Sequence, residues 1–249
     1  MGSSTISLGL GLGGGKAATS SGRLAGGGEF ENDYSISLDG TNDYLQLPNG
    51  VLTALSGTAY TISMWYNLDI VGEYQMIFSA GSNLQIYFRP RGTQVGLEFS
   101  NNGGIRMLQN TPYSNVGSWV HGCISVDTTG TSTMYINGSS NVSASSVPQL
   151  TSISNPVIGS FNGASLFLNG YVDEVAIFNS ALSASDVSDI YNSGVPNDLG
   201  TDGLNLSPVN WWRMGDNDGG TGTTITDQGN GGNNGTLTNG PTYSTTVPS

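Results

Sequence analysis

The sequence predicts an all-β fold in which two antiparallel sheets form a sandwich or jelly roll. Many short segments rich in β-branched and aromatic residues follow one another, separated by turns containing Gly, Asn and Asp. Only one segment has helical spacing, and it lies late in the chain. A length of 249 residues is ordinary for one large β-sandwich. The regular spacing of strands and turns therefore favours a single sandwich.

The first strand is expected at "YSISLDG", residues 34–40, where apolar and polar residues alternate up to an Asp-Gly turn. "AYTISMWYNL" at 59–68 places Ile62, Met64 and Tyr66 on one face of a strand. "MYINGSS" predicts a hairpin, because Asn-Gly suits a type I′ turn that needs positive φ at both residues. Further strands are expected at residues 41–48, 74–81, 84–90, 95–100, 105–110, 118–127, 131–138, 156–161 and 171–179.

The one helix is predicted over about residues 184–192. Ser183 is a suitable N-cap, and Asp186 three residues later approximates a capping box. Gly194 supplies a C-terminal stop. Such a short helix is not stable alone, so its apolar face must lie on the sandwich; that face comprises Val187, Ile190 and Tyr191.

Composition excludes several classes of partner. The chain holds 6 Lys+Arg against 18 Asp+Glu, with a formal net charge of -12. This balance argues against nucleic acid and against anionic membrane surfaces, both of which need clustered basic residues. The single cysteine, Cys123, lies in an alternating run and is expected to pack as a small hydrophobic residue. A surface of neutral polar residues with few charges is typical of extracellular or particle-surface proteins.

Residues 1–28 form a low-complexity, Gly-rich segment that cannot build its own core. One interpretation is an unattached tail, and the other is an extended arm that orders against a neighbouring subunit. Lys16 and Arg23 are two of only six basic residues in the chain, which favours an arm that meets an acidic partner. The start of the chain lacks the basic region of a signal peptide, and no apolar run reaches the ~20 residues that span a membrane.

Four motifs in order resemble the laminin-G-like, or concanavalin A-like lectin/glucanase, jelly-roll family. They are "SLDGTNDYLQLP", "YTISMWYNL", "SWVHGCISVDTTGTSTMYINGS" and "FLNGYVDEVAIFNSALSASDVSDIYNSG", which together cover roughly residues 34–194. The resemblance implies a jelly roll of two antiparallel sheets, with one short helix beside its closing strand. It does not fix the function, because this fold serves lectins, adhesion modules, glycosidases and virion proteins.

The C-terminal segment is similar to the beginning of the same family's domain. "VNWWRMGDNDGG" looks like the family's first strand, which normally precedes the "SLDG" motif. Residues 29–249 are therefore predicted to form one circularly permuted jelly roll, with 205–249 supplying its first strands; the alternative is a truncated second copy. In the permuted fold "NWWRM" lies antiparallel to residues 171–178, and at least one of Trp211 and Trp212 is buried.

The resemblance implies a calcium site near the turns of the early and closing strands. Asp39, Asp43 and Asp173 are the best candidate ligands, and Asp227 joins them if the chain is permuted. Calcium binds several hard oxygens, including carboxylates and carbonyls. The alternative is turn chemistry, because Asp and Asn side chains commonly stabilise turns.

An enzyme is not expected. Glycosidases of this family carry paired acids on one strand, whereas Asp173 and Glu174 are adjacent and should alternate to opposite faces. Glu98 stands alone in its strand, and His121, the only histidine, is expected to be structural. Exposed aromatic residues could form a sugar platform, although core packing is the alternative for each; the candidates are Trp65, Tyr66, Tyr74, Tyr87, Tyr113, Trp211 and Trp212.

These features favour a non-enzymatic structural protein of a virus particle, most of all a bacteriophage. The expected role is a capsid decoration, head-fibre or tail-appendage subunit that displays a lectin-like domain at the virion surface. Its partners would be other virion proteins reached through the arm, further copies of the chain, and a host glycan. The alternative is a secreted or cell-surface carbohydrate-binding module.

Overall fold

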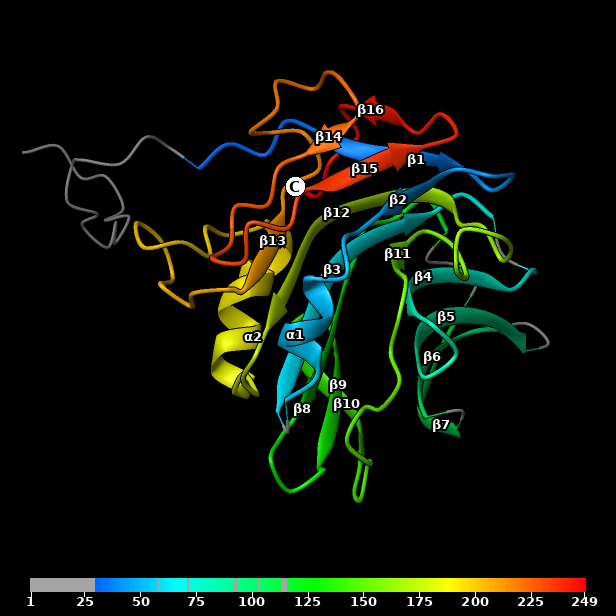
Figure 1. Cartoon of the computed structure of the whole chain (residues 1–249), viewed down its shortest axis with the longest axis vertical. Helices are drawn as coiled ribbons and strands as arrows, with labels where there is room; N and C mark the ends of the chain where they lie inside the picture. Colours follow the sequence, from blue (N-terminus) through cyan, green and yellow to red (C-terminus); the bar gives the residue numbers. More distant parts are fainter. Residues whose placement is uncertain (1–29, 58, 71, 92–93, 103, 113–115) are drawn as a thin grey trace, which may run out of the picture.

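The computed structural model describes residues 30–249 except 58, 71, 92–93, 103 and 113–115. Two antiparallel sheets pack face to face around one core, which confirms the predicted sandwich (Figure 1). The arm expected at 1–28 lies outside the described residues and stays a prediction.

Sheet A is built around the long central strand β12 (Asn169–Phe178). Its strands run in the order β10 (Ser139–Ala144), β9 (Ser132–Ile136), β8 (Val120–Val126), β3 (Tyr60–Leu68), β12, β1 (Ser35–Asp39) and β16 (Thr242–Ser244), and β13 (Asn210–Trp212) also pairs with β12. Sheet B has the order β14 (Thr224–Ile225), β15 (Gly235–Thr238), β2 (Tyr44–Gln46), β11 (Pro156–Ile158), β4 (Gln75–Ala80), β5 (Leu84–Arg91), β6 (Gln94–Asn101) and β7 (Gly104–Pro112).

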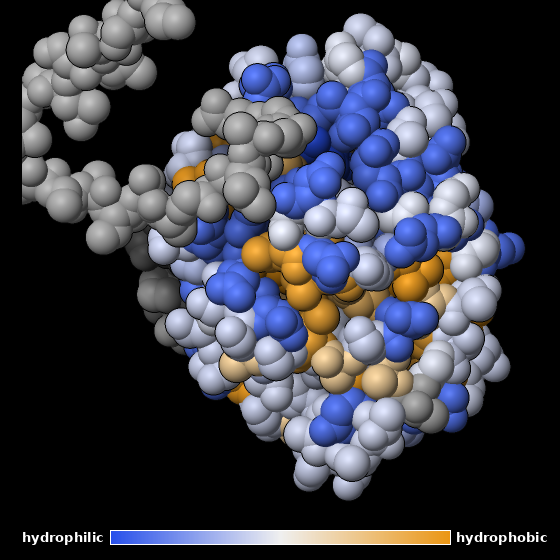
Figure 2. Space-filling view, turned by 90° about the vertical axis from the view of Figure 1, so that its left-hand side faces the viewer, coloured by the Kyte–Doolittle hydropathy of each residue, from blue (hydrophilic) through white to orange (hydrophobic). Residues whose placement is uncertain are grey.

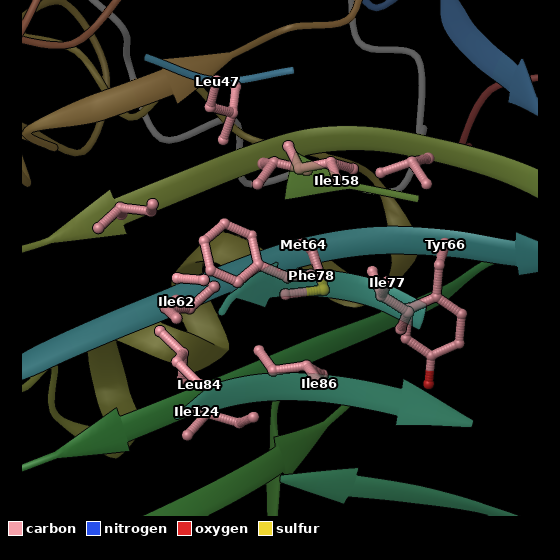
Figure 3. Packing of buried hydrophobic residues seen from close by; sticks show 14 of the residues in the cluster. Leu47, Ile62, Met64, Tyr66, Ile77, Phe78, Leu84, Ile86, Ile124 and Ile158 are labelled. Carbon is pink, nitrogen blue, oxygen red and sulfur yellow. The ribbon is translucent and has the colours of Figure 1, made fainter. Parts of the chain in front are cut away.

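The core lies between the sheets and follows strand alternation. Ile62, Met64 and Tyr66 of β3 all point into it, as predicted, and meet side chains of β4 and β5 such as Phe78 and Ile86 (Figure 3). Asn137 and Gly138 have φ of 49° and 73°, which confirms the type I′ turn between β9 and β10.

Helix α2 (Ala184–Tyr191) begins as predicted, since Ser183 and Asp186 form a full capping box. It ends earlier than expected, because Asn192 rather than Gly194 takes the left-handed position, with φ of 44°; a 3-10 turn, η2 (Asn192–Gly194), follows. The helix packs on the outer face of sheet A, where its buried residues meet Cys123, Ala176 and Phe178. A single helical turn, α1 (Val51–Leu55), was not predicted.

The C-terminal segment completes the sandwich of its own chain. Strand β13 lies antiparallel to β12, with Val175 opposite Trp212, which confirms the predicted pairing. Trp212 is 0% exposed and belongs to the central core, and Trp211 is 5% exposed on the outer side of the sheet. Strand β15 pairs with β2 and β16 pairs with β1, so this segment contributes to both sheets. The permuted order relative to the family stays a prediction.

The two outer faces of the sandwich differ in how much covers them. On sheet A, α2 and the segments around Phe30, Leu199 and Leu206 form a second apolar cluster. Figure 2 views this side and shows apolar surface in the middle of a polar rim. On sheet B, the loop at 159–168 covers β4, where the amide N–H of Asn162 donates to the Ser79 hydroxyl at 3.2 Å. Among the described residues, no helix is long and apolar enough to cross a membrane.

Candidate functional site

The open part of sheet B carries a group of aromatic and charged side chains. In β5, Ile86 and Phe88 point into the core, so Tyr87 between them points outward. Its direct partner in the antiparallel strand β6 is Glu98. Arg89 lies two residues after Tyr87 and therefore shares its face.

Four residues interact on this face, and we call Tyr74, Tyr87, Arg89 and Glu98 the tyrosine platform. The Tyr87 hydroxyl donates to Oε2 of Glu98 at 2.7 Å, and Nη1 of Arg89 lies 3.8 Å from the same oxygen. The ring of Tyr74 stacks on that of Tyr87, with centroids 6.5 Å apart and planes inclined by 18°. The Arg89 guanidinium carbon lies 5.4 Å from the centroid of Tyr74.

Burial divides the platform into an anchor and a contact surface. The Glu98 side chain is 0% exposed, whereas that of Arg89 is 37% exposed and Tyr74 is 44% exposed. Burial and the hydrogen bond to Glu98 raise the pKa of the Tyr87 hydroxyl, so it stays a neutral donor. Glu98 thus positions Tyr87 and Arg89, while Tyr74 offers an exposed ring. A rigid aromatic face beside a few fixed polar groups suits a ligand with apolar and hydroxyl-bearing sides.

Two residues of the tyrosine platform were predicted from the sequence. Tyr74 and Tyr87 were among the candidate aromatics, but Glu98 does not stand alone, because strand pairing sets it against Tyr87. Arg89 was missed, although its two-residue spacing from Tyr87 was a usable signal. Four other candidate aromatics are buried, as their core alternative predicted: Trp65, Tyr66, Trp211 and Trp212. Tyr113 lies outside the described residues.

The acidic pair does not alternate as expected. Glu174 has φ of 46°, and the pairing of β12 with β3 shifts register between Asp173 and Ala176. This bulge turns both carboxylates to the outer side of sheet A. There, Asp173 accepts a hydrogen bond from the Asn32 amide at 3.1 Å, and Glu174 accepts one from the Trp211 indole at 2.5 Å.

The bulge lies at the point where one side of β12 stops pairing with β1 and starts pairing with β13. Residues 169–172 of β12 pair with β1, and residues 175–177 pair with β13. Asp173 and Glu174 therefore face the junction between the start of β1 and the end of β13. Residues 30–34 lead into β1 and residues 213–217 follow β13. The two segments contact each other on the outer side of Asp173 and Glu174.

Glu174, Arg213 and Asp216 form a polar network at this junction, which we call the Arg213 clamp. Nε of Arg213 donates to Glu174 at 3.0 Å, and Nη2 donates to Asp216 at 3.1 Å. Arg213 also donates to the carbonyl of Glu31, and its guanidinium carbon lies 4.2 Å from the ring centroid of Phe30. Asp216 accepts from the backbone N–H of residues 33 and 34, at 2.8 and 2.9 Å. The clamp fixes residues 30–34 to the outer face of sheet A.

A hollow of 350 Å³ lies beside the clamp, lined by Phe30, Trp211, Arg213 and several acids. It suits a sugar less well than the tyrosine platform does. The Trp211 ring is covered by Phe30, with centroids 6.2 Å apart and planes inclined by 12°. Arg213 is already committed to two carboxylates. We therefore assign this region a structural role.

The four predicted calcium ligands do not come together. Asp39 and Asp43 share one turn, where the Asp39 N–H donates to Asp43 at 3.4 Å. Asp39 pairs with Asn169 of β12, and Asp173 lies four residues further along that strand, a separation of about 13 Å. Asp227 accepts four hydrogen bonds, from Asn210, Trp211, Gly229 and Asn233. Within the described part of the chain, no group of three or more Asp, Glu, His or Cys side chains could hold a metal.

His121 is buried on the outer side of sheet A, where its ring centroid lies 6.1 Å from that of Tyr191, and among the described residues it belongs to no group of three or more potential metal ligands. Its Nε2 lies 2.8 Å from the Ser63 hydroxyl, and burial lowers its pKa to about 3. The ring is therefore neutral and structural, in agreement with the expectation from its strand position.

Comparison with known proteins places the chain in a family. Residues 39–188 match the family model of the concanavalin A-like lectin/glucanase superfamily. The chain belongs to this superfamily. The match ends before the C-terminal strands, which the structure adds to the same sandwich. The resemblance seen in the four sequence motifs is thereby confirmed.

Solved structures agree on the fold of this lectin-like jelly roll. A candidate carbohydrate-binding protein from Bacteroides ovatus matches with a TM-score of 0.65 at 18% identity, over 88% of this chain. The chain spans only 62% of the length of that protein. The heptameric SAP-like pentraxin of Limulus polyphemus matches with a TM-score of 0.51 at 19% identity, over 64% of this chain and 82% of that one. No curated protein sequence matches the chain.

The buried acidic pair makes stability depend on pH. Burial, and then the neighbouring Glu174, raise the pKa of Asp173 well above its usual range, and burial raises the pKa of Glu174 to about 7. The folded state thus holds protons that the unfolded chain releases. This stabilisation is complete below the unfolded pKa values of about 4 and is lost as pH rises through the folded values.

We therefore expect the thermal unfolding midpoint to fall between about pH 5 and about pH 8. Asp173→Asn removes one of the two neighbouring buried carboxyls, so the unfolding midpoint of this variant should change less over this range. Scanning calorimetry of both proteins across the pH series measures the difference. A midpoint that rises steadily with pH in the parent protein would contradict the raised pKa values.

Proposed function

We propose that this domain is a non-enzymatic glycan-binding module whose contact surface is the tyrosine platform. One observation carries the proposal: an exposed tyrosine ring is held beside a buried carboxylate and a half-exposed guanidinium on the open face of sheet B. The Tyr74 ring can pack against the C–H face of a sugar, and the Arg89 guanidinium, held in place by Glu98, can donate to its hydroxyls. The lectin-like fold of the chain supports this assignment.

The arrangement of acids supports binding over hydrolysis. Glycoside hydrolysis usually needs two carboxyl groups about 5 to 10 Å apart on either side of a sugar. Asp173 and Glu174 are buried beneath the clamp residues, and Glu98 is buried beneath the platform. None of these three carboxylates reaches an open cleft.

The first test is Tyr74→Ala. We expect binding to glycans on an array to weaken by up to about tenfold, because an aromatic contact worth about 0.5–1.5 kcal/mol is lost. Tyr171→Ala, which truncates a half-buried tyrosine on sheet A, serves as the matched control. Both variants should keep a cooperative unfolding transition. Equal binding by Tyr74→Ala and the parent protein would exclude the platform.

We further propose that the domain is a structural subunit of a virus particle, most of all of a bacteriophage. The Arg213 clamp supports this, because it would transmit an attachment made by residues 1–28 to the body of the domain. Lys16 and Arg23 complement an acidic neighbour, including another copy of a chain with net charge -12. The rival proposal is a secreted or cell-surface carbohydrate-binding module.

Deleting residues 1–28 separates these proposals. For a particle subunit, we expect loss of attachment to particles with an unchanged unfolding midpoint. A Lys16→Glu/Arg23→Glu variant keeps the length of the segment and tests its charge. A deleted chain that still assembles normally would remove the proposed arm.

Calcium is proposed only for the turn that holds Asp39 and Asp43. If calcium binds the folded state alone, stability rises with its concentration. We therefore expect a modestly higher unfolding midpoint in millimolar calcium than in chelator, and a smaller difference in Asp43→Asn. Identical midpoints in the parent protein would exclude both residues as ligands.

A further inference from the structure

A second hollow lies on the sheet A side, where the turn between β9 and β10 meets the end of α2. Its volume is 370 Å³, within the range of about 300–1,000 Å³ that is usual for small-molecule sites. We call it the amide pocket, and its lining includes Asn137, Gly138, Ser188, Asp189, Tyr191 and Asn192.

One wall of the amide pocket is rigid. A Cβ at Gly138 would lie 2.8 Å from Cδ1 of Tyr191, so the turn packs directly on that ring. Tyr191 in turn stacks on the buried Trp65, with centroids 5.7 Å apart and planes inclined by 22°. The side-chain oxygen of Asn137 accepts from the backbone N–H of His121 at 2.9 Å. This bond directs the amide nitrogen of Asn137 away from the strand.

The turn after α2 also lines the amide pocket. Asn192 and Ser193, both lining residues, have φ of 44° and 60°. Asn is, after Gly, the residue that most readily adopts this conformation at the end of a helix. The turn ends α2 and places Asp189 and Asn192 at the same hollow.

The chemistry of the lining selects one class of ligand. It combines a carboxylate, amides, hydroxyls and one aromatic ring, and none of its lining residues is Lys or Arg. An anionic sugar would meet Asp189 without a compensating cation. A neutral sugar can donate two adjacent hydroxyls to the Asp189 carboxylate and accept from the amide of Asn137.

We propose that the amide pocket is a second binding site, specific for uncharged sugar units. The proposal rests on the proposed function only for the class of ligand, since the two sites share no residue. The tyrosine platform lies on the outer face of sheet B and the amide pocket on the outer side of sheet A. One domain with both sites can hold two glycan chains at once.

The test is an amide NMR titration of the whole chain with three neutral probes: D-glucose, D-galactose and N-acetyl-D-glucosamine, each at millimolar concentrations. We expect shifts at Gly138, at the side chain of Asn137 and along residues 188–192. D-Glucuronate should leave these signals unchanged. Shifts at Tyr74 and Tyr87 report the tyrosine platform separately.

Two variants assign the shifts. Asp189→Asn should weaken binding at the amide pocket about tenfold, because a charge-assisted hydrogen bond is worth about 1.5 kcal/mol or more. Asp202→Asn removes an exposed carboxylate elsewhere and is the matched control. Ser188→Trp fills the hollow and should abolish these shifts while leaving those at the platform.

The outcomes separate the two proposals. Shifts at the platform alone, with every probe, overturn the amide pocket and leave the proposed function intact. Shifts at the amide pocket alone support this inference and count against the platform. Pocket shifts that persist in Ser188→Trp, or equal shifts with D-glucuronate, overturn the site or its specificity.

Discussion

Removal of residues 209–249 is expected to unfold the whole domain. The deletion takes β13 from β12, β16 from β1 and β15 from β2, so both sheets lose strands. It also removes Trp212, a fully buried member of the central core. Truncating one such tryptophan to alanine costs about 3–5 kcal/mol, and the total stability of a domain is about 5–15 kcal/mol.

Circular dichroism and thermal unfolding measure this outcome. The shortened chain should lose its cooperative transition, and Trp212→Ala should lower the midpoint while the transition remains. Deletion of residues 1–28 is the control, because it shortens the chain at the other end without removing any described strand of the two sheets. A cooperative transition after removal of 209–249 would show that the C-terminal strands are dispensable.

Arg213→Ala is expected to cost about 3–5 kcal/mol, the usual effect of removing one partner from a buried ion pair. The substitution leaves Glu174 buried beside Asp173 without its cation. It also removes the hydrogen bond to the Glu31 carbonyl and the contact with the Phe30 ring. Residues 30–34 should therefore exchange their amide hydrogens faster.

A double substitution distinguishes charge from packing. Glu174→Gln combined with Arg213→Met removes both charges and keeps most of the volume, so it should be more stable than Arg213→Met alone. Urea unfolding of the parent, the two single variants and the double variant gives the coupling energy. A single variant that loses less than about 1 kcal/mol would place Arg213 among exposed ion pairs, which contribute little.

Local patterns predicted most of the fold. The alternation of Ile62, Met64 and Tyr66, the Asn137-Gly138 turn and the Ser183–Asp186 capping box all appear as expected, because each depends on neighbours in sequence. Helix α1 escaped prediction because five residues contain too little periodicity to recognise. Helix α2 ends earlier than predicted because Asn192 adopts the left-handed conformation that was expected at Gly194.

The candidate sites were harder to predict, since they depend on pairing and register. Strict alternation separated Asp173 from Glu174, but positive φ at Glu174 brought them to one side. Asp227 was expected at a metal, yet backbone and amide donors from its own loop occupy its oxygens. The contact between Glu98 and Tyr87 depends on how β5 and β6 are aligned with each other. That alignment cannot be read from the sequence of either strand alone.

The junction on β12 also determines how the domain bears mechanical load. Strand β1 begins directly after the clamped residues 30–34 and lies between β12 and β16, hydrogen-bonded to both. Tension applied along β1 from residue 30 therefore shears two ladders at once and does not open them one bond at a time. The hydrogen bonds that Arg213 and Asp216 make to residues 31–34 lie between the point of loading and those ladders, so they would break first. A load applied at this end of the domain would therefore be shared between both neighbours of β1.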